Sequence, residues 1–127
     1  MEKIPTNSGD KKDNNEKRFK EALNDFLAGD IERTAQYLKE NPEQISKFCH
    51  RAAYGYMGVI EAGLQGLMIF ADHLAPSDNE NLPEDIKDSV DKLIRTDVEG
   101  VLEYYDGNVE VVIKKYSDLI TYFLRML

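Results

Sequence analysis

Apolar residues recur three and four positions apart along most of the chain, the spacing that places them on one face of an α-helix. This pattern predicts a first helix over residues 15–28, which Gly29 ends. Asp30 is then placed to cap a short second helix. The helix predicted over residues 109–127 has the clearest pattern, with apolar residues on one face and charged residues opposite.

The middle of the chain predicts two longer helices, one over residues 42–75 and one over residues 83–105. Residues 106–108, Asp-Gly-Asn, supply a stop for the second of these and a cap for the last helix. No segment alternates in the manner of a β-strand. We therefore expect an all-α fold: a single-domain bundle of about five helices over residues 15–127, with a long central helix that contains glycines, and a disordered, polar arm over residues 1–14.

Small residues line one side of the predicted central helix. At about 100° per residue, four of them form a continuous groove: Gly55, Gly58, Ala62 and Gly66. A groove of small residues lets another helix backbone approach closely, which repays the low helix propensity of glycine. The partner is either a neighbouring helix of the same chain or a second copy, so a homodimer is one expected state.

Three polar residues mark another side of the same helix. His50, Glu61 and Asp72 stand eleven residues apart, which is close to three whole turns, so the pattern aligns them. They are either the solvent edge of a mostly buried helix or a buried polar ladder. An acid near the middle of a bilayer costs roughly 3 kcal/mol, whereas each strongly apolar residue gains only about 0.5 kcal/mol. This segment is therefore not expected to cross a membrane.

The spacing of the candidate residues supports neither a metal site nor a catalytic site. Neither histidine follows a glutamate by three residues, as the ligands of di-iron bundles do, and we expect no metal and no cofactor. The single cysteine, Cys49, falls on the apolar face and is interpreted as a buried structural thiol. His50 is the candidate acceptor of a phosphoryl group in a phosphotransfer bundle, although Ala53 and Tyr54 stand where such bundles typically have lysine and glycine.

Negative charge is concentrated in one quarter of the chain. Residues 78–110 contain eleven acids and three bases, which accounts for the whole net charge of −8. Some acids are spaced for ordinary helix pairs, as Asp88 is with Lys92. The candidate protein-binding surface, called here the acidic face, consists of Asp88, Glu99, Glu103 and Asp106. The last three crowd the end of the predicted helix, where the helix dipole disfavours anions, so helix formation does not explain them.

Asp97 lies within the apolar stripe of the same predicted helix, between Ile94 and Val101. Burying an acid is costly unless it is paired or protonated. Asp97 is therefore expected to be a buried acid that meets a cation or a hydroxyl group, unless the stripe faces solvent or a partner there.

These features predict a non-enzymatic regulator or adaptor that binds a protein with a basic surface. A negative surface disfavours direct binding to nucleic acid or to an anionic membrane. One cysteine permits no internal disulfide, which suits a reducing cytoplasm. Two alternatives stay open: an inhibitor of the phage counter-defence type that mimics nucleic acid and binds a basic nucleic-acid-binding partner, and the phosphotransfer bundle that uses His50.

Overall fold

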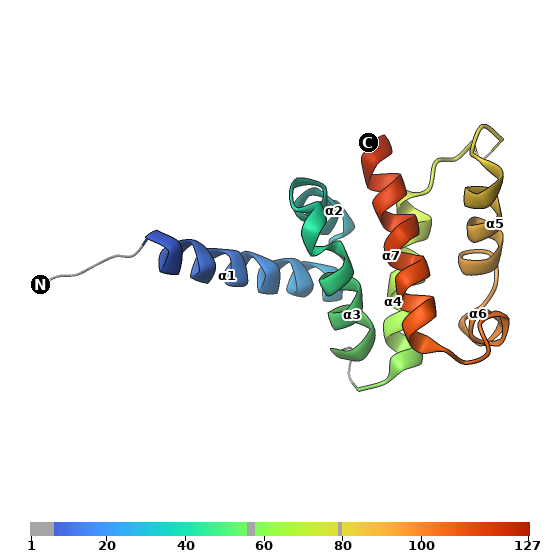
Figure 1. Ribbon diagram of the computed structural model, residues 1–127, viewed down its shortest axis with the longest axis horizontal. Helices are drawn as coiled ribbons and strands as arrows, with labels where there is room; N and C mark the ends of the chain where they lie inside the picture. The colour runs from blue at the N-terminus through green and yellow to red at the C-terminus, as the bar shows by residue number, and fades with distance from the viewer. Residues whose placement is uncertain (1–6, 56–57, 79) are drawn as a thin grey trace, which may run out of the picture. The chain divides into compact units, whose positions relative to one another are not determined.

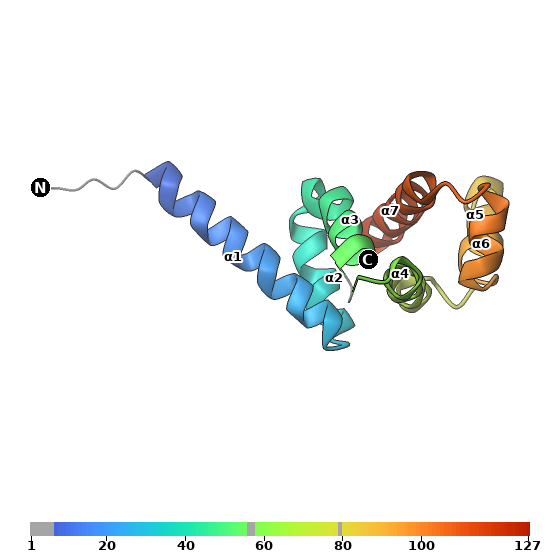
Figure 2. The ribbon, with the colours of Figure 1, turned by 90° about the horizontal axis from the view of Figure 1, so that it is seen from below.

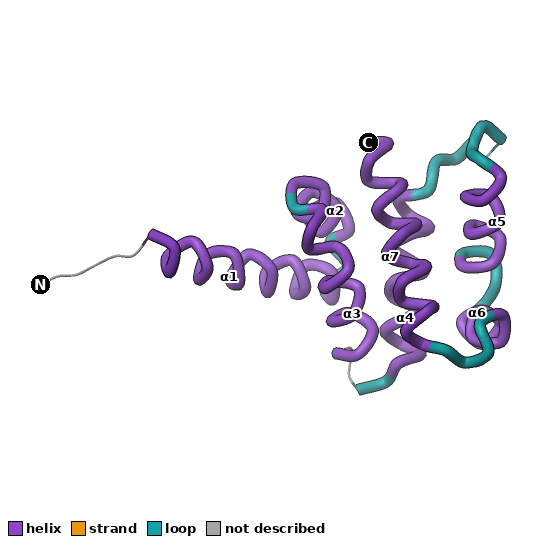
Figure 3. Tube along the Cα trace, in the orientation of Figure 1, coloured by secondary structure: helices purple, strands orange, loops and turns teal. Residues whose placement is uncertain are grey.

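The computed structural model describes the backbone of residues 7–55, 58–78 and 80–127, with side chains from Asn14 onward. Every regular element in these residues is a helix (Figure 3), which confirms the all-α fold class. The elements are α1 (Asn7–Leu27), α2 (Ile31–Glu40), the 3-10 helix η1 (Pro42–Gln44), α3 (Ile45–Gly55), α4 (Ile60–Leu74), α5 (Glu84–Leu93), α6 (Val98–Tyr104) and α7 (Val109–Met126). None of these helices is long and apolar enough to cross a membrane.

Contacts divide the chain into two compact units, residues 1–37 and residues 38–127, with the boundary inside α2. In the first unit α1 begins at Asn7, earlier than the apolar pattern predicts. Residues 7–14, expected to belong to a disordered arm, are therefore helical, because extending an existing helix fixes one residue for each hydrogen bond gained. Residues 1–6 of that arm lie outside the described residues.

The junction between α1 and α2 follows the expected rules for helix ends. Gly29 ends α1 with a φ of +83°, a left-handed conformation that glycine adopts without strain. Asp30 then caps α2, since its Oδ1 accepts a hydrogen bond from the backbone N–H of Arg33 at 3.2 Å. The ring of Phe19 meets that of Tyr37 edge-on, with centroids 6.4 Å apart.

The second unit is built around three helices. α3, α4 and α7 pack against one another, and α5 and α6 cover the side of α4 and α7 that lies away from α3 (Figures 1 and 2). The core between them is formed by fully buried side chains, the largest of which are Phe48, Leu64, Leu67, Phe70, Leu93, Ile113, Tyr116, Leu119, Ile120 and Phe123. α5 and α6 therefore form an outer layer with one face on the core and the other in solvent.

The single central helix predicted over residues 42–75 is wrong. η1, α3 and α4 occupy this stretch, and the chain reverses direction between α3 and α4 (Figure 1). Gly58 has a φ of +71°, which lies outside the right-handed helical region and requires a turn. The reversal lets two helices bury their apolar faces against each other and against α7, a gain that one long helix would forgo.

The predicted groove is lost with that helix. Gly55 ends α3 and Gly58 lies in the turn, so neither shares a helix face with Ala62 and Gly66 of α4. The close approach of two backbones nevertheless occurs, one position away from the predicted set, at Gly63.

Gly63 packs directly on α3 of the same chain. A Cβ atom placed on Gly63 would lie 2.4 Å from the carbonyl oxygen of Ala53 and 2.7 Å from that of Ala52. Real Cβ atoms essentially never come this close to backbone. Gly63 therefore permits the close contact between α3 and α4, whereas a Cβ atom at Gly55 or Gly58 would meet nothing within 4 Å.

The helix predicted over residues 83–105 is also divided. α5 ends at Leu93, whose carbonyl oxygen accepts a hydrogen bond from the buried Tyr116 hydroxyl at 2.8 Å. Asp97 then starts α6 as its N-cap, because its Oδ1 accepts from the Gly100 N–H at 2.9 Å. Asp97 is exposed, so its prediction as a buried acid is wrong. An aspartate just before an apolar helical run is an ordinary N-cap signal, and the assumption of one continuous helix obscured it.

Candidate functional site

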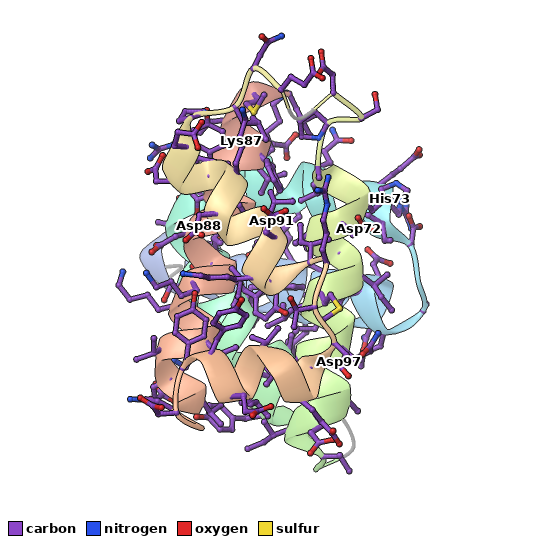
Figure 4. All side chains as sticks on the ribbon, turned by 90° about the vertical axis from the view of Figure 1, so that its right-hand side faces the viewer. Asp72, His73, Lys87, Asp88, Asp91 and Asp97 are labelled. Carbon is purple, nitrogen blue, oxygen red and sulfur yellow. The ribbon has the colours of Figure 1, made fainter. Side chains whose placement is uncertain are left out.

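The acidic face lies on the outer layer formed by α5 and α6. All four of its residues are exposed: Asp88, Glu99, Glu103 and Asp106. Figure 4 shows this side of the molecule, with Asp88 and Asp91 on α5 and Asp97 where α6 begins. The helices thus gather carboxylates from two elements over one part of the surface.

Three of the four acids on α5 have a cation within ion-pair distance. Asp88 and Lys92 form an ion pair with 3.0 Å between Oδ2 and Nζ, and Asp91 and Arg95 form another at 3.2 Å. Both pairs have the predicted i,i+4 spacing. The hydrogen bond from Lys92 to Asp88 raises the pKa of Lys92. The Lys92 ammonium also lies 5.5 Å from the centre of the Tyr104 ring. These contacts neutralise much of the charge that α5 contributes.

The acids of the α6 region differ. Glu99 stands in the first turn of α6, where the helix dipole favours an anion. The prediction that it lies near the C-terminal end of a helix is therefore wrong. Glu103 is in the last turn, and Asp106 follows the helix with a φ of +55°. No described lysine, arginine or histidine lies within ion-pair distance of these three carboxylates. They are the unneutralised part of the acidic face.

The surface beside Asp88 also contains a hollow. A hollow of about 350 Å³ lies between α5 and α7, with Asp85, Asp88, Tyr105, Lys115 and Asp118 among the residues that line it. Close by in the sequence, the Tyr104 side chain is 57% exposed. An acidic surface with an exposed aromatic ring offers both charge and apolar contact to a protein partner.

The polar line of His50, Glu61 and Asp72 does not form, because His50 lies on α3 and the other two residues on α4. Glu61 and Asp72 are exposed, so no buried polar ladder is present in this part of the described chain. His50 is instead half-buried and belongs to a different group of side chains.

His50 joins Tyr54 and Glu110 in a cluster that the sequence pattern does not predict. The Nε2 atom of His50 lies 3.0 Å from Oε1 of Glu110, which stands in the first turn of α7, and its Nδ1 lies 3.0 Å from the carbonyl oxygen of Ser46. The Tyr54 hydroxyl donates a hydrogen bond to Oε2 of Glu110. The rings of His50 and Tyr54 stack, with centroids 6.3 Å apart.

Both nitrogens of His50 face acceptor atoms, so both contacts are hydrogen bonds only when the imidazole is doubly protonated. The hydrogen bond to the Ser46 carbonyl, followed by that to Glu110, raises the pKa of His50. The same group of contacts, led by Tyr54, lowers the pKa of Glu110. In that doubly protonated form the ring has no lone pair with which to attack a phosphoryl group. This geometry therefore gives the phosphotransfer alternative no support.

Cys49 is fully buried, as the apolar pattern predicts. Burial raises the pKa of its thiol to about 12, although a hydrogen bond with Ser117 opposes this shift. A protonated, enclosed thiol is a packing group and not a nucleophile. Among the described residues there is also no group of three or more histidine, cysteine, aspartate or glutamate side chains that could hold a metal ion.

Comparison with known proteins adds no relative. No protein-family model matches the chain, and no curated protein and no solved structure is similar enough to count as a match.

Proposed function

We propose that this chain is a non-enzymatic regulator or adaptor that binds a protein with a basic surface through its acidic face. One observation carries the proposal: Glu99, Glu103 and Asp106 are exposed on the outer layer without a described cation within ion-pair distance. Three of the four acids on α5 have such a cation, so the contrast lies within one surface.

Electrostatic complementarity explains how such a surface would work. A negative patch on a chain with a net charge of −8 speeds the encounter with a positive patch and disfavours acidic partners. Exposed Tyr104 supplies a large apolar contact beside Glu103, and tyrosine is enriched where binding energy is concentrated. Charge thus selects the partner, and the aromatic ring adds affinity.

The test compares two variants that lose the same charge. The first is Glu99→Gln, Glu103→Gln and Asp106→Asn together. The control is Glu43→Gln, Glu61→Gln and Asp72→Asn, which are exposed acids on η1 and α4. Partners captured from the native host by each tagged protein are quantified by mass spectrometry. We expect a specific partner to be lost from the first variant and kept by the control.

Two results count against the proposal. Equal capture by the native protein and both variants would show that the acidic face is only a solvated surface. Equal loss of the partner from both variants would show that only net charge matters. Adding salt or duplex DNA to the captured complex then distinguishes an ordinary protein partner from a nucleic-acid-binding one. An adaptor's partner should dissociate as salt screens the charges and stay bound when duplex DNA is added, whereas release by DNA would favour the nucleic-acid mimic.

A further inference from the structure

We propose that His50, Tyr54 and Glu110 form a proton-dependent clamp, which ties the start of α7 to α3 at mildly acidic pH and loosens as the pH rises. His50 and Tyr54 are one turn apart on α3, whereas Glu110 is sixty residues beyond His50 and belongs to α7. The cluster is thus a polar link between two helices of the core. It is separate from the acidic face, and the inference does not depend on the proposed function.

Every polar atom of the Glu110 carboxylate is used in the clamp. Oε1 faces His50 and Oε2 faces Tyr54, so the two donors of α3 hold Glu110 from two sides. The Ser46 carbonyl fixes the other ring nitrogen of His50 and with it the orientation of the ring. When His50 loses a proton, a single N–H serves two acceptors, so either Glu110 or Ser46 then faces a lone pair.

The elements packed against α3 carry other charged groups. Those on η1, α4 and α7 are Glu43, Glu61, Asp72, His73, Lys114, Lys115, Asp118 and Arg125. Among the described residues, none of these bonds to His50, Tyr54 or Glu110, and Lys114 is paired with Asp118 at 3.5 Å. On α3 itself the cations are Lys47 and Arg51. Among the described residues, Glu110 is therefore the charged side chain that bonds to His50, and it acts together with the Ser46 carbonyl.

The direction of each shift defines the pH window. The pKa of His50 is raised from 6.5, so its contribution to stability is complete below about 6.5 and is lost as the pH rises through the folded-state value. The pKa of Glu110 is lowered from 4.5, so its contribution is present above about 4.5 and is lost as the pH falls through the folded-state value. The clamp is strongest between these limits.

NMR titration of the full-length chain tests the link directly. The pKa of His50 is measured in the native protein and in Glu110→Gln, which keeps the shape of the side chain and removes its charge. Glu61→Gln is the control, since it removes an exposed acid from α4. We expect Glu110→Gln to lower the pKa of His50 and Glu61→Gln to leave it nearly unchanged. An unchanged pKa in Glu110→Gln would overturn the clamp.

A double-mutant cycle tests whether the link depends on the proton. His50→Gln, Glu110→Gln and the double variant are unfolded with urea at about pH 5.5 and about pH 8.5, on either side of the ordinary histidine pKa. We expect the interaction between the two positions to be favourable at the lower pH and to shrink at the higher one. An interaction equal at both pH values would overturn the proton dependence, and none at either pH would overturn the contact itself.

Discussion

At the scale of single residues, Gly63 shows how one missing side chain sets the distance between two helices. The nearest atoms to its absent Cβ are backbone atoms of Ala52 and Ala53 on α3. Backbone cannot rotate away as the end of a flexible side chain can, so a methyl group here must push the helices apart. The backbone of Gly63 is not in the left-handed region, so its conformation does not require glycine. The close packing against α3 does.

Gly63→Ala should therefore destabilise the protein. Overpacking of a core contact typically costs about 1–3 kcal/mol, which outweighs the gain of up to about 1 kcal/mol in helix propensity. Gly55→Ala is the matched control, because a Cβ atom at Gly55 meets nothing within 4 Å. Urea unfolding should show a lower midpoint for Gly63→Ala and an unchanged or higher one for Gly55→Ala. Equal midpoints would mean that α3 and α4 are not in close contact at Gly63.

At the scale of elements, the positions where helices end decide what their charged residues do. If residues 83–105 formed one helix, Asp97 would lie in its apolar stripe and Glu99 near its C-terminal end, both unfavourable positions for an acid. In the structure the two residues begin α6, where acids are favourable. Where α5 ends, the Tyr116 hydroxyl of α7 donates a hydrogen bond to the carbonyl oxygen of Leu93, one of the carbonyls that a helix end leaves without a partner in the helix. That contact joins residues far apart in the sequence, so local periodicity does not reveal it.

Asp97→Ala should test this reassignment. Removing an N-cap side chain costs about 1 kcal/mol, since one N–H at the start of α6 loses its partner. Asp97→Asn keeps an acceptor oxygen and should retain most of the stability. Chemical unfolding of the three proteins gives the comparison. If Asp97→Asn were as destabilising as Asp97→Ala, the carboxylate charge and not the capping oxygen would be the stabilising feature.

At the scale of the whole molecule, features of composition and local spacing were predictable, whereas features made by distant contacts were not. The all-α class, the cap at Asp30 and the i,i+4 pairs of α5 follow from neighbouring residues alone. The turn at Gly58 was missed because an apolar pattern can continue through a break when both helices bury the same kind of face. The cluster around His50 was missed because Glu110 comes from α7 and no short-range pattern connects them.

Cys49 provides a probe of how the unit of residues 38–127 opens. Its thiol is fully buried on α3, beside Ser117 of α7, so we expect a reagent to reach it when the packing of α3 opens. A raised pKa of about 12 also keeps the native thiol protonated at neutral and mildly alkaline pH, where a free thiol would begin to ionise. Burial therefore protects the thiol in two ways, by excluding the reagent and by keeping the sulfur protonated.

Labelling of Cys49 with a thiol reagent should be at least about a thousandfold slower in the native protein than in urea, given the stability of typical domains. Glu61→Cys in a Cys49→Ala background places a thiol at an exposed position of α4 and should react quickly without denaturant. Native Cys49 that reacted as fast as this control would show that the packing of α3 opens freely. Slow labelling that rises in parallel with the loss of helical circular dichroism would instead show that burial of Cys49 and folding of this unit are one cooperative event.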